Sequence, residues 1–211
     1  MFTGLVSDIG TVAAVEGRQA GLRHLRIHSS YDPASIVMGA SIACSGPCLT
    51  VVGFGPRPEG GAWFDVDAAA ETLARTTLET WGIGRRINLE RSMRIGDELG
   101  GHLVTGHVDG VAQIVAREDV VAGEEAAAWG QVSRFDIRAP RGLARFIAEK
   151  GSVSLDGTSL TVNTVHDDVF SVMLIPHSLS VTTWGERKAG DDINLEVDLM
   201  ARYAARLSEV R

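Results

Sequence analysis

Ile87-Asn88-Leu89-Glu90 returns unchanged as Ile193-Asn194-Leu195-Glu196, 106 positions further along the chain. Other segments of the first half also recur in the second half, in the same order. They pair Thr3-Gly4-Leu5-Val6 with Thr105-Gly106-His107-Val108, Ser41-Ile42 with Ser152-Val153, Leu49-Thr50-Val51 with Leu160-Thr161-Val162, Phe64-Asp65-Val66 with Phe170-Ser171-Val172, and Thr76-Thr77 with Thr182-Thr183. Two copies of roughly 100 residues indicate a duplicated domain rather than a solenoid, which needs three or more short repeats.

The second copy contains a pattern that is typical of a β-hairpin. The segment from Ser152 to Leu155 alternates polar and apolar residues, and the alternation resumes at Leu160 and Val162. Between them, Asp156-Gly157 is typical of a type I′ hairpin turn, and Ser45-Gly46 stands at the same place in the first copy. Many short strands of this kind predict a mainly β protein with a compact antiparallel barrel in each half.

A short helix is predicted before each hairpin. In the second copy, Pro140 suits the first helical position and Gly151 would stand just past the end. In the first copy, Asp32 could cap a shorter helix that Pro33 opens and Gly39 closes.

The end of the second copy has no counterpart in the first. Asp198 could cap a helix carrying Leu199, Tyr203 and Leu207 at four-residue spacing, extended by Val210. An apolar stripe on such a helix indicates a contact between subunits, although packing back on its own domain fits the pattern equally well.

The join between the copies falls near residues 95–101, where three glycines provide flexibility. We therefore divide the chain into an N-terminal barrel (residues 1–97), a C-terminal barrel (98–196) and a C-terminal helix (197–211).

Composition excludes several classes of function. With 45% apolar and 22% charged residues, the chain is typical of a soluble globular protein, and its net charge of −7 argues against binding nucleic acid. No apolar stretch approaches the roughly 20 residues that span a bilayer, and Met1-Phe2-Thr3-Gly4 does not begin a signal peptide. Two cysteines are too few for a disulfide framework. We expect a cytoplasmic protein without a membrane or nucleic-acid partner.

Two local patterns resemble a dinucleotide-binding loop and a metal site, but neither fits in detail. Gly53-Phe54-Gly55 is followed by Pro56 and Pro58, which would block the helix of a dinucleotide-binding loop, so a surface hairpin loop is expected there. His102 and His107 are five positions apart and would face opposite sides of a strand, and no further ligand cluster accompanies them. No metal site is predicted.

Other polar residues each have a plain explanation when taken singly. Cys48 could be a small buried hydrophobe. His102 could carry a proton near neutral pH, but taken singly it is rather expected to be a structural hydrogen-bonding group. Ser159 and Lys150 could be solvated groups at strand ends, and Asp198 a helix cap. Taken together with the surrounding motifs, these residues indicate a more specific function.

In order along the chain, the motifs resemble those of riboflavin synthases of the trimeric, duplicated-barrel type. The carriers are Met1-Phe2-Thr3-Gly4, Gly46-Pro47-Cys48-Leu49-Thr50-Val51, Glu71-Thr72-Leu73, Arg75-Thr76-Thr77, Gly100-Gly101-His102-Leu103-Val104-Thr105-Gly106-His107-Val108-Asp109-Gly110, Lys150-Gly151, Asp156-Gly157-Thr158-Ser159-Leu160-Thr161-Val162 and Leu174-Ile175-Pro176-His177. The likeness covers essentially the whole chain.

This resemblance implies a fold and a reaction. The fold would be two similar six-stranded antiparallel Greek-key barrels, each with short helices, plus a C-terminal trimerisation helix. The reaction would be a dismutation of two 6,7-dimethyl-8-ribityllumazine molecules into riboflavin and 5-amino-6-ribitylamino-pyrimidinedione, with no metal or redox cofactor. The N-terminal barrel of one subunit would face the C-terminal barrel of its neighbour in a homotrimer, and a lumazine synthase could be a partner.

The resemblance also implies the site residues. Cys48, His102, Ser159 and Asp198 would be catalytic, with Cys48 and His102 in the N-terminal half-site and Ser159, Thr161 and Lys150 in the C-terminal one. The substrate-binding residues would be Phe2, Gly4, Leu5, Val6, Ser41, Cys48, Leu49, Thr50, Asp67, Ala68, Ala69, Ala70, Glu71, Thr72, Gly101, His102, Leu103, Lys150, Thr158, Ser159, Leu160, Thr161, Met173, Leu174, Ile175, Pro176, His177 and Ser178.

The chain departs from the family pattern beside Cys48. Ser45 stands where the family commonly has Asn, and Pro47 replaces a smaller or more flexible residue, which leaves the orientation of Cys48 open. Two alternatives to the enzyme use the same fold: a non-catalytic lumazine- or flavin-binding antenna protein, and a purely structural barrel trimer.

Overall fold

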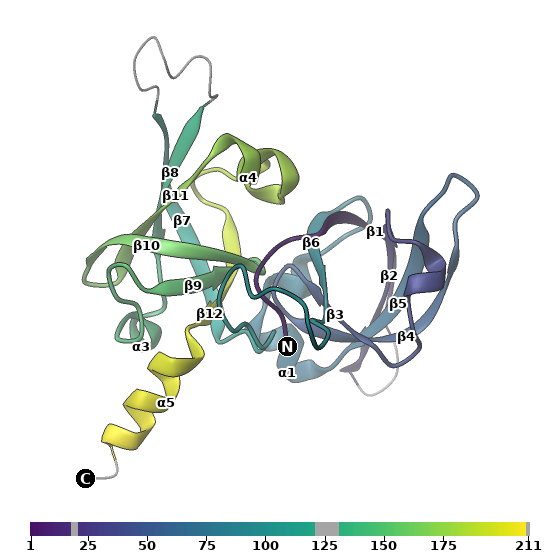
Figure 1. Cartoon of the computed structure of the whole chain (residues 1–211), viewed down its shortest axis with the longest axis horizontal. Helices are drawn as coiled ribbons and strands as arrows, with labels where there is room; N and C mark the ends of the chain where they lie inside the picture. Colours follow the sequence, from purple (N-terminus) through teal and green to yellow (C-terminus); the bar gives the residue numbers. More distant parts are fainter. Residues whose placement is uncertain (18–20, 121–130, 210–211) are drawn as a thin grey trace.

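The strands that the repeat predicts close into two barrels lying side by side, in a computed structural model that describes residues 1–17, 21–120 and 131–209 (Figure 1). The strands of the first barrel are β1 (Asp8–Gly17), β2 (Arg23–Ser29), β3 (Ser41–Cys44), β4 (Cys48–Pro56), β5 (Ala62–Ala68) and β6 (Arg86–Arg91). Its helices are η2 (Pro33–Ser35), α1 (Ala70–Arg75) and η3 (Thr77–Thr80).

The second barrel repeats this plan. Its strands are β7 (Gly110–Val120), β8 (Val132–Arg138), β9 (Ser152–Leu155), β10 (Thr158–His166), β11 (Val169–Leu174) and β12 (Asp192–Val197). Its helices are α3 (Arg141–Ala144), α4 (Pro176–Val181) and η4 (Thr183–Glu186), followed by α5 (Leu199–Ser208). The order around the first barrel, β1-β2-β5-β4-β3-β6, matches the order around the second when each number is raised by six. Two closed six-stranded antiparallel barrels confirm the predicted fold class.

Each barrel has its own apolar core because alternate strand residues point inward. Phe64, Leu25 and Ile27 are fully buried in the first core, and Phe135, Ile137 and Val153 in the second. Burial of this apolar surface is the main stabilising contribution to each barrel.

The predicted hairpin turns are confirmed in both copies. Ser45 and Asp156 have φ of 46° and 45°, and the glycine after each also has positive φ, as a type I′ turn requires. In the first barrel the amide of Cys44 donates to the carbonyl of Pro47 at 2.9 Å, which closes a two-residue loop.

The predicted helix after Pro140 is much shorter than expected. Helix α3 ends at Ala144, and Pro140 is its cap rather than its first residue. The amide of Ile147 donates to the carbonyl of Ala144, a spacing of three that tightens the chain and directs the Ile147 side chain into the core. Gly151 therefore does not end a helix. In the first copy, Asp32 caps a 3-10 turn that ends at Ser35, well before Gly39.

The expected surface loop at Gly53-Phe54-Gly55 is wrong. These residues lie inside β4, which carries an irregular register between Val51 and Gly53 and continues to Pro56. The glycines leave room for the ring of Trp63 on the neighbouring strand, which lies over Gly55. The actual turn is Arg57 to Gly61.

Helix α5 projects away from both barrels (Figure 1). It is capped by Asp198 as predicted, since the Asp198 carboxylate accepts a hydrogen bond from the amide of Met200 at 2.8 Å. Of the predicted stripe, Leu199 is half-buried, whereas Tyr203 and Leu207 are 60% and 73% exposed. Met200 on the same side is 73% exposed, so the face of Met200, Tyr203 and Leu207 does not pack back on its own domain. Val210, the expected extension of the stripe, lies outside the described residues.

The repeated tetrapeptides join the two barrels. The Asn88 side chain accepts from the amide of Thr183 at 2.8 Å and donates to the carbonyl of Asp156 at 2.9 Å. Asn194 makes the reciprocal bonds to the amide of Thr77 and the carbonyl of Ser45, both at 2.7 Å. Each asparagine therefore holds the hairpin turn of the other barrel. No helix in the described part of the chain is long and apolar enough to cross a membrane.

Candidate functional site: two half-sites built by exchanged segments

Each barrel is covered at one hairpin by a segment from the other copy. The amide of Ser159, at the start of β10, donates to the carbonyl of Gly4 at 2.8 Å, and the amide of Cys48, at the start of β4, donates to the carbonyl of Gly106 at 2.9 Å. The amides and carbonyls of Phe2 and Val104 are paired where the two segments cross. The exchange creates two related half-sites, one at Cys48 and one at Ser159.

Two buried glutamates hold these segments in place. The Glu90 carboxylate accepts hydrogen bonds from the amides of Thr3 and Gly4 at 2.7 and 2.9 Å. Glu196 accepts the equivalent bonds from Thr105 and Gly106 at the same two distances. The last residue of the repeated tetrapeptide is thus the anchor of the segment that covers the opposite barrel.

The covering segments approach so closely that only glycine fits at the contact. A Cβ added to Gly106 would lie 2.5 Å from the Cys48 Cβ, and one added to Gly4 would lie 2.5 Å from the Ser159 Cβ. Both glycines also have φ of 76°, which L side chains rarely adopt.

Gly106→Ala is therefore expected to destabilise the protein and displace the segment over Cys48. Gly39→Ala is the matched control because Gly39 has φ of 77° but nothing within 4 Å of an added Cβ. The control isolates the backbone strain, about 1–2 kcal/mol, and thermal unfolding should show a clearly larger loss for Gly106→Ala. Equal losses for the two variants would show that the contact with Cys48 is not tight.

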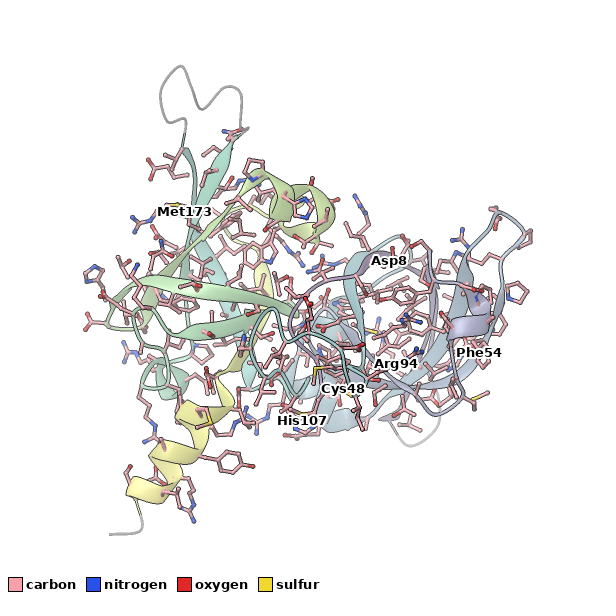
Figure 2. The ribbon with its side chains drawn as sticks, viewed as in Figure 1. Asp8, Cys48, Phe54, Arg94, His107 and Met173 are labelled. Carbon is pink, nitrogen blue, oxygen red and sulfur yellow. The ribbon has the colours of Figure 1, made fainter. Side chains whose placement is uncertain are left out.

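The first half-site is a cavity of about 430 Å³ beside Cys48. Glu71 and Thr72, two of the predicted binding residues, line it together with His107 from the covering segment. Figure 2 places Cys48 and His107 next to each other, where the strands of the first barrel meet that segment. In the sequence, His107 is weighed as a metal ligand and belongs to a family motif, but it is not predicted in either half-site. Its signal was its position in the repeat, because it aligns with Leu5 in the segment that covers Ser159.

The second half-site gathers the other predicted catalytic residues. His102 Nδ1 lies 2.7 Å from the Ser159 hydroxyl, and the Asp198 carboxylate acts electrostatically on the same ring. The expected grouping of His102 with Cys48 is wrong. The chain just before the segment that covers Cys48 runs beside Thr3, to whose carbonyl the His102 amide donates at 3.1 Å, and this brings His102 to Ser159. Burial lowers the pKa of His102 below its ordinary value of 6.5, against the opposing effects of Asp198 and Glu196. The ring is therefore neutral at pH 7.

The walls around the reactive residues are open to solvent. On the first barrel, the exposed or half-buried members of the predicted set are Ser41, Thr50, Asp67, Ala69, Ala70, Glu71 and Thr72. On the second barrel they are Lys150, Leu160, Thr161, Met173, Ile175, Pro176, His177 and Ser178, and on the crossing segments Leu5, Val6, Gly101 and Leu103. Leu5, Met173 and Ile175 are large apolar side chains left exposed, as on a surface awaiting a ligand or a neighbouring subunit.

Five residues of the predicted binding set have buried side chains. Phe2 packs with Ala43 and Val104 between the barrels, and Leu49, Ala68 and Leu174 belong to the barrel cores. The hydroxyl of Thr158 accepts a hydrogen bond from the indole of Trp184 at 3.2 Å. These side chains offer no surface to a ligand. Gly4 is likewise covered by Ser159.

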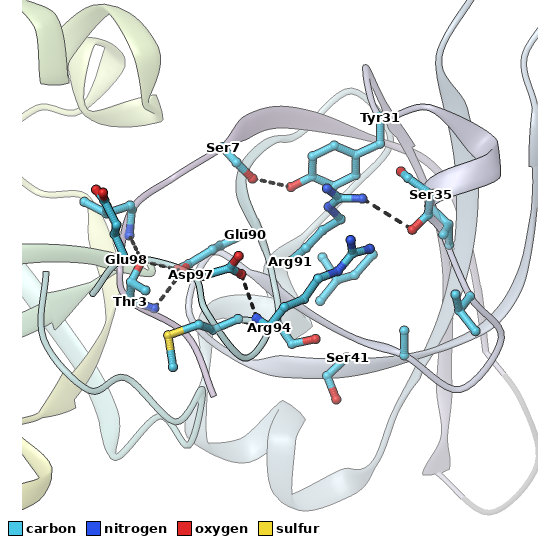
Figure 3. A pocket seen from close by; sticks show the side chains of 17 residues that line it. Thr3, Ser7, Tyr31, Ser35, Ser41, Glu90, Arg91, Arg94, Asp97 and Glu98 are labelled. Carbon is cyan, nitrogen blue, oxygen red and sulfur yellow. Dashed lines mark hydrogen bonds between the residues drawn. The ribbon is translucent and has the colours of Figure 1, made fainter. Parts of the chain in front are cut away.

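A larger cavity, of about 650 Å³, opens at one end of the first barrel (Figure 3). It includes Ser41 and Leu5, but several of its polar groups bond to one another: the hydroxyls of Ser7 and Tyr31 lie 2.7 Å apart, and the amide of Arg94 donates to Asp97 at 2.7 Å. The reactive side chains do not gather there. Within the described residues, no group of three His, Cys, Asp or Glu side chains could hold a metal ion.

Comparisons with known proteins agree with this architecture. The lumazine binding domain family matches twice, at residues 3–92 and 105–198. Riboflavin synthase from Brucella abortus (strain 2308) is 56% identical over 209 residues, covering 99% of this chain and 98% of that protein. Riboflavin synthase from Mycobacterium bovis is 42% identical over 210 residues, covering 98% of each. The crystal structure of LumP complexed with riboflavin has the same fold, with a TM-score of 0.76 at 23% identity over 93% of this chain and 99% of that one.

Fold, paired half-sites and domain matches define a duplicated lumazine-binding protein. The two relatives narrow this class to one family, because both are riboflavin synthases and both align with nearly the whole chain. The chain belongs to the riboflavin synthase family, enzymes that transfer a four-carbon unit between two lumazine molecules.

Proposed function

We propose that the protein dismutates two molecules of 6,7-dimethyl-8-ribityllumazine, giving riboflavin and 5-amino-6-ribitylamino-pyrimidinedione, at a site formed by the Cys48 and Ser159 half-sites. The observation that carries the proposal is the pair of related but unequal half-sites. One substrate bound twice, in opposite roles, requires two pockets of similar shape and different chemistry. LumP has been crystallised with riboflavin and with 6,7-dimethyl-8-(1′-D-ribityl) lumazine on the same fold, which supports ligands of this class.

The residues present suit the steps of this reaction. A proton must leave the C7 methyl group of one lumazine, and the resulting carbanion is delocalised into the ring. A nucleophile, either water or a side chain, then adds at C7 of the other lumazine before the four carbons transfer. Neutral His102, bonded to Ser159, can accept or return a proton, and the Cys48 thiol lies in the other half-site.

Orientation is the other contribution expected from the protein. Holding the two rings in register can supply several kcal/mol, about 7–11 at best. The exposed wall residues of both barrels are proposed to contact the ring edges and the ribityl chains.

We further infer a homotrimer in which the first barrel of one subunit meets the second barrel of the next. The exposed Met200, Tyr203 and Leu207 face of α5 supports an intersubunit contact. Cytoplasmic location is supported by the two free cysteines. Association with a lumazine synthase is an expectation from the family, and co-elution of the two purified proteins would test it.

The pH dependence of turnover tests the role of His102. Because burial lowers its pKa, the ring is expected to stay neutral and active down to pH values below 6.5, and kcat/KM should fall only as it protonates there. His102→Ala should lose about 100-fold or more in kcat and should also lose this acidic limb. A variant with the wild-type rate and pH profile would remove His102 from the mechanism.

A further inference from the structure

The segment that covers Cys48 is fastened on both sides of His107. Before His107, the Glu196 carboxylate holds two backbone amides of the segment, as described above. After His107, the Asp109 carboxylate accepts a hydrogen bond from the amide of Val197 at 2.9 Å. Both Asp109 and His107 line the cavity beside Cys48. The place of His107 in the half-site therefore depends on how firmly Asp109 is held.

Asp109 is also bound by helix α5. The oxygen that accepts from Val197, Oδ2, lies 2.9 Å from Nη2 of Arg202, one turn after the helix cap. The Asp109 side chain is only 14% exposed. Burial raises the pKa of Asp109, whereas the Val197 amide and Arg202 lower it. Arg202 therefore helps to keep this carboxylate charged, and a charged acceptor binds the Val197 amide more strongly.

This tie to a helix is not part of the repeat. Ser7 stands in the first copy where Asp109 stands in the second, directly after the matching covering segment. The hydroxyl of Ser7 lies 2.7 Å from the hydroxyl of Tyr31, within the first barrel. After β6 the chain continues into the loop between the copies, at the place where α5 follows β12. Arg202 and Asp109 thus form a contact that the second copy has in addition to the shared fold.

The contact with Asp109 is the more buried of two ion pairs that hold α5 on the second barrel. At the far end of the helix, Arg145 lies 2.9 Å from Glu209, and these side chains are 61% and 42% exposed. An ion pair as exposed as this contributes little to stability. None of the residues of α5 is buried, so apolar packing holds the helix only weakly. The positions of α5 and of the covering segment are therefore coupled mainly at Arg202.

We propose that Arg202 is a positioning residue of the Cys48 half-site, which acts through Asp109 to hold the segment carrying His107 at a place set by helix α5. The inference rests on the proposed function in one respect, because it concerns one of the same two half-sites. Arg202 does not itself line the cavity among the described residues, so its effect passes through Asp109. Any contact that steadies α5 would steady the same half-site.

Alkylation of the two cysteines by iodoacetamide, followed by mass spectrometry of the whole protein's peptides, tests this without ligand. Cys48 is half-buried beneath the covering segment, whereas Cys44 is fully buried in the barrel core and reports global unfolding. Arg202→Met should raise the rate at Cys48 about 3- to 10-fold and leave the rate at Cys44 unchanged. Arg202→Lys, which keeps a charge that reaches Asp109, should recover most of the protection. Turnover should fall in step with the loss of protection.

Two further variants separate this role from a general loosening of the helix. Arg145→Met breaks the other ion pair of α5 and should leave the rate at Cys48 unchanged. Asp109→Asn should raise that rate as Arg202→Met does, and it serves if Arg202→Met does not fold. The double variant should resemble either single variant, because both remove the same contact. An unchanged rate at Cys48 in Arg202→Met, an equal rise in Arg145→Met, or a parallel rise at Cys44 would overturn the inference.

The proposed function can fail separately. Its test is riboflavin formation by the wild type, whereas the role of Arg202 is read from thiol alkylation with no substrate present. A wild type that made no riboflavin would contradict the function and leave the alkylation result standing. An active wild type whose Cys48 stayed equally protected in Arg202→Met would contradict only the role of Arg202.

Discussion

Asn194→Ala is expected to lower the free energy of unfolding by about 2–5 kcal/mol. The substitution leaves the buried amide of Thr77 and the buried carbonyl of Ser45 without partners, and each such group costs about 1–3 kcal/mol. Because Ser45 begins the turn that precedes Cys48, turnover should fall together with stability. Denaturant unfolding and steady-state turnover, measured on one preparation, check both expectations.

The chain offers a matched control for this variant. Asn163, the asparagine that joins no barrels, lies half-buried in β10, and Asn163→Ala should change stability by well under 1 kcal/mol. Asn88→Ala should resemble Asn194→Ala, since its bonds are the reciprocal ones. If Asn194→Ala behaved like Asn163→Ala, the asparagines would not be what joins the barrels.

Mixing two inactive variants is expected to restore activity if the site forms between subunits. Cys48→Ala removes the thiol of the first half-site, and His102→Ala removes the ring from the second. In a cyclic trimer with random exchange, about a quarter of the interfaces would join an intact first barrel to an intact second barrel. Turnover should therefore rise from near zero to about a quarter of the wild-type rate after exchange.

A double variant provides the control for the mixing experiment. Cys48→Ala mixed with Cys48→Ala/His102→Ala contains no intact first half-site, so it should remain inactive. If the first mixture also stayed inactive although mass spectrometry showed exchanged trimers, both half-sites of one reaction would lie in one chain. High activity of Cys48→Ala alone would instead remove the thiol from the chemistry.

Features set by neighbouring residues could be predicted from the sequence. Asp156-Gly157 and Ser45-Gly46 form the predicted hairpin turns, which require positive φ at both residues. The alternation of strand residues correctly predicts that Phe64 and Val66 point into the barrel core. The duplication itself was visible because one offset relates the tetrapeptides at Ile87 and Ile193. The helix after Pro140 is shorter than the sequence predicts because the core contact of Ile147 outweighs local helical preference.

Features that depend on long-range contacts could not be predicted. The family resemblance groups His102 with Cys48, but the crossing of the two segments brings it to Ser159, 57 residues further along the chain. The same crossing places His107 in the cavity of Cys48. Nothing local indicates that Asn88 bonds to the opposite copy, or that Glu90 anchors the segment at Thr3 and Gly4 that crosses to the second barrel.

The most direct test of the account is to mix the purified protein with 6,7-dimethyl-8-ribityllumazine alone and to follow both compounds by absorbance. Dismutation predicts that riboflavin appears at half the rate at which lumazine disappears, with no other reactant added. Tight binding with a fluorescence change but no riboflavin would contradict the account and identify an antenna-type binding protein instead.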